Sequence, residues 1–145
     1  MTPNGLTTVE VLIVLAIISV TIVLALPELN HFQQKHQIRS ELSPLIRAIT
    51  VSRDQAIIFN RSIIICPSLD QYLCGGNWHD GFISFIDEDR DNQRGNHERI
   101  LMSKESYRDG DLVFWRAFRR RNFLEFTPLG FTAFQNGTFT YCPRE

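Results

Sequence analysis

The chain has almost no net charge and no recognisable catalytic motif. Its 15 Lys and Arg residues balance 16 Asp and Glu residues, which leaves a formal charge of -1. This balance excludes binding of nucleic acid or anionic lipid over the whole surface, so any polyanion site must be a local patch. No serine lies in a Gly-x-Ser-x-Gly context, and none of the 4 histidines belongs to a nucleophile or metal motif. The sequence therefore predicts a protein that is not an enzyme and uses no cofactor, with no cleft that places Ser or Cys beside His.

Ionisable side chains are also scarce near the N-terminus. From Leu6 to Leu26 the only one is Glu10, and the leader from Met1 to Gly5 contains neither Lys nor Arg. A helix over Leu6 to Leu26 is long enough to cross a hydrocarbon core of about 30 Å. A carboxylate there costs about 2.5 to 3.5 kcal/mol, so it needs a partner charge, and a newly exposed N-terminal amine would supply one. The sequence therefore predicts a retained membrane segment.

The same residues match a processing signal. Gly5, Leu6, the Thr-x-x-Glu that ends at Glu10, the apolar run and Pro27 resemble the class III signal of type IV pilins and type II secretion pseudopilins. The resemblance implies that prepilin peptidase cuts between Gly5 and Leu6, that Leu6 becomes the N-methylated first residue, and that Glu10 meets the amine of a neighbouring subunit. The departures are a leader without basic residues and Leu6 where Phe is usual. An ordinary single-pass anchor is the alternative interpretation.

Helical periodicity continues beyond this apolar segment. Apolar residues recur at steps of three and four while charged residues occupy other faces, which predicts an amphipathic helix that lies on a sheet. Pro27 and Pro44 each remove a helical hydrogen-bond donor, so we expect a kink or short break at both, or a restarted helix capped at Ser43-Pro44. The apolar face is predicted to contain Ile38, Leu42, Leu45, Ile46, Ile49, Ala56 and Ile57.

After Asn60 the pattern changes to short runs of β-branched and aromatic residues separated by Gly, Asn, Asp and Pro, which indicates antiparallel strands. A long N-terminal helix followed by such a sheet predicts an α+β, pilin-like fold. The expected parts are a leader (1–5), a transmembrane and filament-core helix (6–29) and one periplasmic head (30–145). The predicted strands are Ser62–Cys66, Gly81–Ile86, Arg99–Ser103, Asp111–Trp115, Phe123–Phe126 and Gly137–Cys142.

Motifs in the head narrow the resemblance. They are Ile65-Cys66-Pro67-Ser68, Cys74, Trp78-x-x-Gly81-Phe82-Ile83-x-Phe85-x-Asp87, Leu124-x-Phe126-x-Pro128-x-Gly130 and Gly137-Thr138-Phe139-x-Tyr141-Cys142. Together they are similar to the GspH/FimT group of minor pseudopilins and minor pilins. The resemblance implies a subunit anchored in the bacterial inner membrane, which joins other pilins in a type IV pilus or a type II secretion pseudopilus. Members usually continue past the last cysteine with another strand and a Gly-Arg-x-Arg tail, whereas this sequence stops at Glu145, through truncation or loss of that element.

Three cysteines lie in the predicted periplasmic head, where disulfides persist. The simplest arrangement is one pair and one free thiol. A Cys66–Cys74 link would close a short loop and stabilise the fold by roughly 2 to 3 kcal/mol, whereas pairing with Cys142 would fasten the C-terminal strand. Both pairings stay open. A zinc site that adds His79 to these cysteines is disfavoured, because the tight Cys-x-x-Cys spacing is missing.

An acidic loop matches part of a calcium-binding pattern. Asp87, Asp89, Asp91 and Glu98 occupy positions 1, 3, 5 and 12 of that pattern, but Asn92 replaces its turn glycine. The alternative is a solvated turn, because charged residues are common in loops.

A basic window interleaved with aromatics follows the fourth predicted strand. Arginines neutralise phosphates and aromatic rings stack on bases, so this window is a candidate DNA contact. FimT-like proteins of naturally competent bacteria bind DNA through basic residues, some of them in the missing tail, so a DNA receptor for transformation is the alternative function. A surface turn rich in Arg is the simpler explanation. The candidate residues are Arg116, Arg119, Arg120, Arg121 and, near the C-terminus, Arg144.

Overall fold

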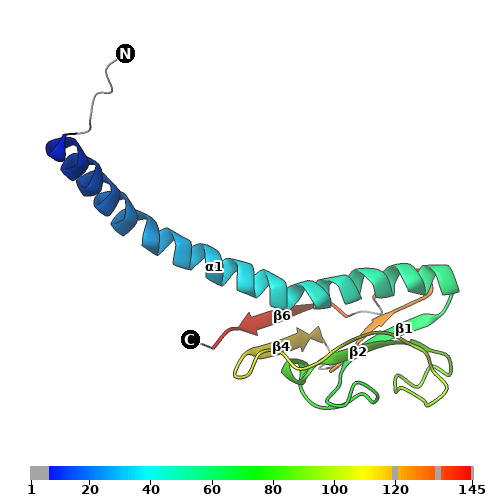
Figure 1. Cartoon of the computed structure of the whole chain (residues 1–145). Helices are drawn as coiled ribbons and strands as arrows, with labels where there is room; N and C mark the ends of the chain where they lie inside the picture. Colours follow the sequence, from blue (N-terminus) through cyan, green and yellow to red (C-terminus); the bar gives the residue numbers. More distant parts are fainter. Residues whose placement is uncertain (1–6, 119–120, 133–134, 145) are drawn as a thin grey trace. The chain divides into compact units, whose positions relative to one another are not determined.

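The structure is a computed structural model that describes residues 7–118, 121–132 and 135–144, with the backbone alone for 23–31. The chain divides into two compact units, Met1–Arg39 and Ser40–Glu145. The fold is α+β, as predicted, with one long helix followed by antiparallel strands (Figure 1). The elements are α1 (Thr8–Phe59), β1 (Ser62–Pro67), the 3-10 helix η1 (Trp78–Asp80), β2 (Phe82–Asp87), β3 (Ile100–Lys104), β4 (Leu112–Ala117), β5 (Leu124–Phe126) and β6 (Gly137–Cys142).

The N-terminal part of α1 is apolar and solvent-exposed. From Val9 to Ile22 its large apolar side chains are between 45% and 65% exposed. Exposure of this kind over many consecutive residues marks a surface that requires a partner or a lipid environment. Within the described residues, no helix contains an apolar stretch of the length that a membrane crossing requires.

α1 runs through both prolines without interruption. The helix is continuous at Pro27 and Pro44, so the expected break, and the restart at Ser43-Pro44, are wrong. A proline removes one backbone donor and leaves the carbonyl four residues earlier unpaired. At Pro44 that carbonyl belongs to Ser40, which is an exposed residue whose carbonyl water can reach.

The last turns of α1 lie over the four-stranded sheet (Figure 1). Leu45, Ala48 and Ala56 are at most 2% exposed and pack in the main core, with Leu42 and Ile49 partly buried against it. The small residues on this face let helix and sheet approach closely. Ile46 and Ile57 are 61% and 52% exposed, so their predicted place on the buried face is wrong. They lie about 100° around the helix from Leu45 and Ala56, beyond the reach of the sheet.

The main sheet is antiparallel, with the strand order β3-β2-β1-β5. All predicted strands are present, with ends shifted by at most two residues. β1 is central and buried throughout, which fits its run of three isoleucines. Ile63 and Ile65 face the core beneath α1, while Ile64 and Cys66 join a second cluster on the opposite face.

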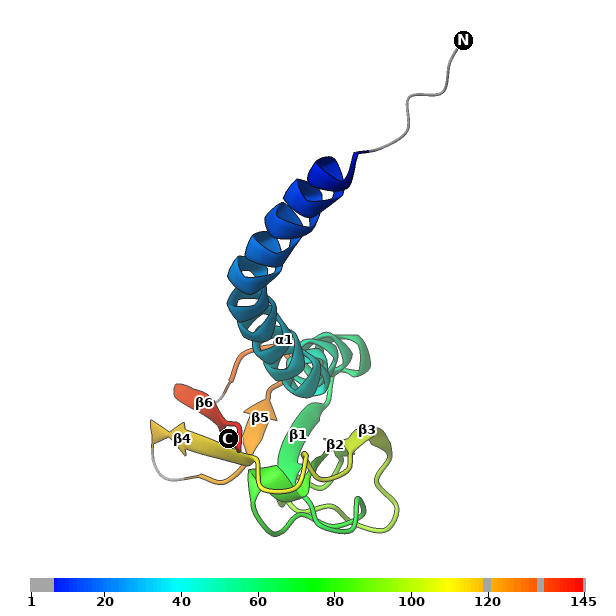
Figure 2. The same ribbon diagram turned by 60° about the vertical axis from the view of Figure 1, so that its left-hand side comes forward.

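β4 and β6 form a separate two-stranded ribbon. Figure 2 shows this ribbon on the side of β5 that is remote from β1. Its inner face carries Trp115 and Phe139, whose stacked ring centroids are 4.4 Å apart, and Phe139 meets Trp78 of η1 edge to face at 4.8 Å. These aromatic contacts attach the ribbon to the core of the head.

Candidate functional site

Glu10 closes the N-terminus of α1. Its backbone N donates to Thr7 Oγ1 at 3.3 Å, and Thr7 N donates to Glu10 Oε2 at 3.5 Å. This reciprocal pair is a capping box, and the carboxylate also lies at the positive end of the helix dipole. Glu10 therefore has a local structural role, which the Thr-x-x-Glu spacing could have indicated. The predicted cleavage residues Gly5 and Leu6 lie outside the described residues.

The disulfide joins Cys66 to Cys74, with Cα atoms 5.5 Å apart, while Cys142 is free and exposed. The enclosed loop is organised by Asp70, whose Oδ1 accepts hydrogen bonds from Ser68 Oγ and from the backbone N atoms of Tyr72 and Leu73. The bonds from Leu73 and Tyr72 hold the pKa of Asp70 below its ordinary value. The loop thus carries a fixed negative charge.

This disulfide loop also presents apolar side chains to solvent. Leu69, Tyr72 and Leu73 are 70%, 64% and 52% exposed. Isolated exposed apolar residues are ordinary, but here three lie within one short loop that a disulfide closes. We call this segment, from Cys66 to Cys74, the apolar loop.

The acidic loop brings three of its four predicted ligands together. Carboxylate oxygens of Asp87, Asp89 and Asp91 lie within 4.8 Å of one another. Burial, with the charges of Glu98 and Asp89, raises the pKa of Asp87 above its ordinary value. Glu98 does not join them, because its carboxylate accepts bonds from the backbone N atoms of Glu88 and Gly95.

The aspartates of this loop also have protein partners. Asp87 accepts from the N atoms of Arg90 and Asn92, at 2.8 and 3.3 Å. Asn92 stands in the glycine position of the calcium pattern and adopts a left-handed φ of 61°. The turn is therefore formed by hydrogen bonds within the chain.

The described arginines of the basic window have different surroundings. Arg116 is exposed on β4, whereas Arg121 pairs with Glu125 at 3.7 Å. Arg119 and Arg120 lie outside the described residues, and the Arg144 backbone N donates to Asp111. The structure thus leaves Arg116 as the one described guanidinium of this window without a partner among the described residues.

The aromatic residues of the window divide between two faces of β4. Trp115 points inward and donates through Nε1 to the carbonyl of Arg121 at 3.1 Å, so it is not free to stack on a base. A surface pocket of about 500 Å³ lies beside it, lined by Trp115, Arg116, Ala117, Arg121 and Asn122. Both described arginines of the window, Arg116 and Arg121, therefore line the same pocket.

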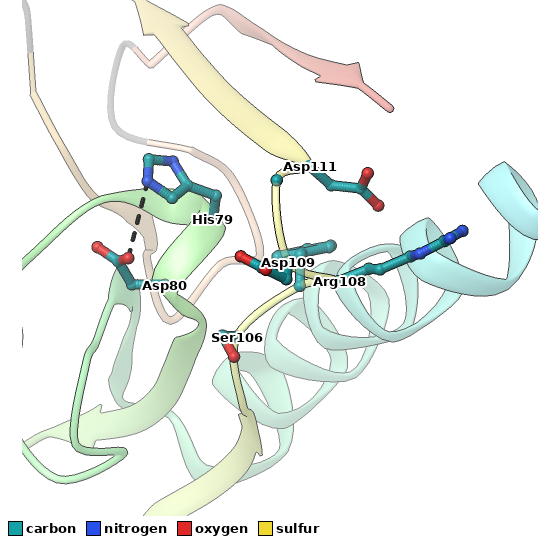
Figure 3. Close-up of a pocket in the computed structure, with 8 residues that line it drawn as sticks. His79, Asp80, Ser106, Arg108, Asp109 and Asp111 are labelled. Carbon is teal, nitrogen blue, oxygen red and sulfur yellow. Dashed lines mark ion pairs between the residues drawn. The ribbon is translucent and has the colours of Figure 1, made fainter. Parts of the chain in front are cut away.

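A second pocket, of about 210 Å³, contains a serine and a histidine (Figure 3). Both residues line this pocket, but no hydrogen bond joins Ser106 to His79 among the described residues. His79 Nε2 lies 3.7 Å from Asp80 Oδ1, but His79 Nδ1 is buried without a hydrogen-bond partner among the described residues. Figure 3 shows the Ser106 hydroxyl turned away from the imidazole. The pocket lacks the contact between nucleophile and base that covalent catalysis requires. Its lining is His79, Asp80, Ser106, Tyr107, Arg108, Asp109, Gly110 and Asp111.

Sequence reasoning missed the outer face of the ribbon. Leu112 and Phe114, at alternate positions of β4, are 39% and 47% exposed, and Phe118, which follows the strand, is 65% exposed. Arg116 shares this face. We call Leu112, Phe114, Arg116 and Phe118 the ribbon face. The period-two pattern was visible, but sequence could not tell which side would meet the core.

The head is a helix packed on an antiparallel sheet. The class is that of pilin-like structural subunits. The sequence model of one family, described as type II transport protein GspH, matches residues 43–145, and the chain belongs to that family. Members of this family are structural pseudopilin subunits, which associate with other pilins or pseudopilins. No curated protein and no solved structure matches the chain.

Proposed function

We propose that this protein is a non-enzymatic minor pseudopilin or minor pilin, anchored in the bacterial inner membrane before it enters a filament. The observation that carries the proposal is the family match over the head, 43–145. The exposed apolar side chains from Val9 to Ile22 support it, because a surface of this kind requires lipid or other helices around it. Glu10 then neutralises a neighbouring N-terminal amine during assembly.

Maturation supplies the first test. Cleavage by prepilin peptidase after Gly5 leaves Leu6 as a methylated N-terminus, and intact-mass measurement of the protein from bacterial membranes detects both changes. A mature chain that keeps Met1 to Gly5 contradicts this processing.

The two roles of Glu10 can be separated by two substitutions. Glu10→Gln keeps a side-chain acceptor for Thr7 N but removes the charge, whereas Glu10→Ala removes both. If the charge directs assembly, both variants enter filaments poorly while they reach the membrane normally. If Glu10→Gln assembles like the native chain, the capping box alone explains the residue. Quantifying the protein in sheared filament fractions, relative to membranes, decides between the two.

A second candidate function is DNA binding by a minor pilin. The pocket that Arg116 and Arg121 line favours it, because arginine side chains neutralise the phosphates of a nucleic-acid backbone. Binding through these groups would be weak, insensitive to sequence and steeply reduced by salt. Replacing Arg116, Arg119, Arg120 and Arg121 by Ala should then abolish a gel shift of duplex DNA at low salt. A shift that survives these substitutions removes this window from consideration.

A further inference from the structure

Two exposed surfaces of the head each combine apolar side chains with one charged side chain, and the two charges have opposite signs. The ribbon face surrounds Arg116 with Leu112, Phe114 and Phe118. The apolar loop surrounds Asp70 with Leu69, Tyr72 and Leu73. Each surface therefore places one charge among large apolar side chains.

Each of the two charges is available for a contact. The hydrogen bonds that Asp70 accepts from Ser68, Tyr72 and Leu73 all end on Oδ1, so none of these three residues uses Oδ2, and Asp70 is exposed. Arg116 forms no ion pair with any residue that the structure describes. A guanidinium and a carboxylate oxygen of this kind form a charge-assisted hydrogen bond when they meet.

Both surfaces are held in shape before any partner arrives. The disulfide and the Asp70 hydrogen bonds fix the loop, and six register pairs between β4 and β6, from Leu112↔Cys142 to Ala117↔Gly137, fix the ribbon. Preorganised surfaces lose less conformational entropy on binding.

We propose that the apolar loop of one copy docks on the ribbon face of a second copy, where Arg116 pairs with Asp70 Oδ2. The two surfaces lie at different places on the same chain, so the contact is heterologous. This inference rests on the proposed function, in which subunits stand side by side.

The size of the surfaces determines when the contact forms. Three exposed apolar side chains supply on the order of 300 Å² per partner, below the roughly 800 Å² of a stable complex. The contact is therefore weak between free chains. It becomes populated where the N-terminal part of α1 holds copies together and raises their effective concentration.

Cross-linking through the native thiol tests the docking. Cys142 lies opposite Leu112 on the ribbon face, and it is free and exposed. Full chains carrying Tyr72→Cys and Cys142→Ser are mixed with native chains in lipid vesicles and treated with a short bismaleimide. We expect a cross-linked dimer in the mixture and none with either chain alone. A matched control, Leu129→Cys with Cys142→Ser, exposes a thiol at a side chain that is 75% exposed elsewhere on the head, and it should give little dimer.

Charge reversal shows whether the cross-link reports the proposed pair. Arg116→Glu in the chain that supplies Cys142 should lower the dimer yield at least about fivefold. Leu73→Lys on the opposing loop should restore part of it, because it places a positive charge beside the reversed residue. The proposal is overturned if Arg116→Glu leaves the dimer yield unchanged, or if Leu129→Cys gives as much dimer as Tyr72→Cys.

Other occupants of the ribbon face would give distinct results. A dimer of native chains through Cys142 alone would indicate contact between two ribbon faces. Protection of Cys142 from maleimide by duplex DNA, but not by added chain, would assign the face to nucleic acid. Either result overturns docking by the apolar loop. A Leu6 N-terminus without cross-linking would overturn the docking and leave the proposed function intact.

Discussion

The two parts of α1 have the same conformation and opposite surroundings. Around Val9 to Ile22 the large apolar side chains are all exposed, whereas in the head Leu45, Ala48 and Ala56 are buried against the sheet. In the head the apolar face of the helix is covered by the sheet, whereas the apolar side chains from Val9 to Ile22 have no surface covering them among the described residues. Apolar side chains stabilise a fold only where another surface removes them from water. The difference predicts that the first part acts in assembly and the second part in the stability of the head.

The largest effect should come from a cavity under the head part of α1. Leu45 is 2% exposed, so Leu45→Ala should lower the free energy of unfolding of the head by about 2 to 5 kcal/mol. Ile17 is 59% exposed, and the matched Ile17→Ala should change it by less than about 0.5 kcal/mol. Trp78 and Trp115 lie in the head core, so denaturant titration followed by tryptophan fluorescence measures both. Equal losses of stability in Leu45→Ala and Ile17→Ala would show that the two parts of α1 do not differ in their contribution to the stability of the head.

Removing the disulfide should have the next largest effect. Cys66→Ala with Cys74→Ala should cost about 2 to 3 kcal/mol, because the unfolded chain regains the freedom of the closed loop. Cys142→Ala is the control and should be close to neutral, since this thiol is free and exposed. The same titration under oxidising conditions gives both values. A neutral double variant would show that the loop is constrained by the Asp70 hydrogen bonds alone.

A smaller, pH-dependent effect is expected at Asp111, which joins the start of β4 to the end of β6. It accepts hydrogen bonds from the Tyr141 hydroxyl and from the Arg144 N, and the Tyr141 bond is the main cause that lowers the pKa of Asp111. Because the folded pKa lies below the ordinary value of 3.8, the charged form stabilises the fold above that pH. This contribution disappears as the pH falls through the folded pKa.

Asp111→Asn should therefore cost about 1 to 2 kcal/mol at pH 7, and less as the solution is acidified below about pH 3. Urea titrations of both proteins between pH 2 and pH 7 measure the convergence. If the difference in unfolding free energy between the two proteins stays constant from pH 2 to pH 7, the loss comes from altered packing or hydrogen bonding and not from the charge of Asp111.

The smallest effect is expected at the acidic loop, a part of the head whose polar groups already have partners. Backbone N atoms donate to Asp87, Asp89 and Asp91, and Glu98 binds elsewhere in the loop. We expect millimolar calcium to shift the Tm by less than about 1 °C, because an ion would displace these bonds. A clear rise that Asp89→Ala abolishes would instead establish a calcium site.

The fold was largely predictable because its signals are local. Three successive isoleucines and the following turn residues predicted β1, and three- and four-residue spacing predicted the helix. The face of the helix was predicted less well. Ile46 and Ile57 fit the spacing as well as Leu45, but the sheet covers an arc too narrow to reach them.

The candidate sites were predicted only in part. The spacing correctly predicted that Asp87, Asp89 and Asp91 lie close together. It did not predict that Glu98 accepts hydrogen bonds from backbone N atoms instead of joining them. Likewise, Ser106 and His79 are far apart in sequence and share a pocket only through the packing of their loops.

The sequence by itself determined the helix, the strands, the apolar N-terminal segment and the motifs of the family, because each depends on residues near one another in the chain. Tertiary structure decided which cysteines pair and which side of β4 faces the core. These outcomes depend on contacts between distant segments. Asp70 and Arg116 illustrate the division: their apolar neighbours are visible in the sequence, and only the fold decides that those neighbours stay exposed.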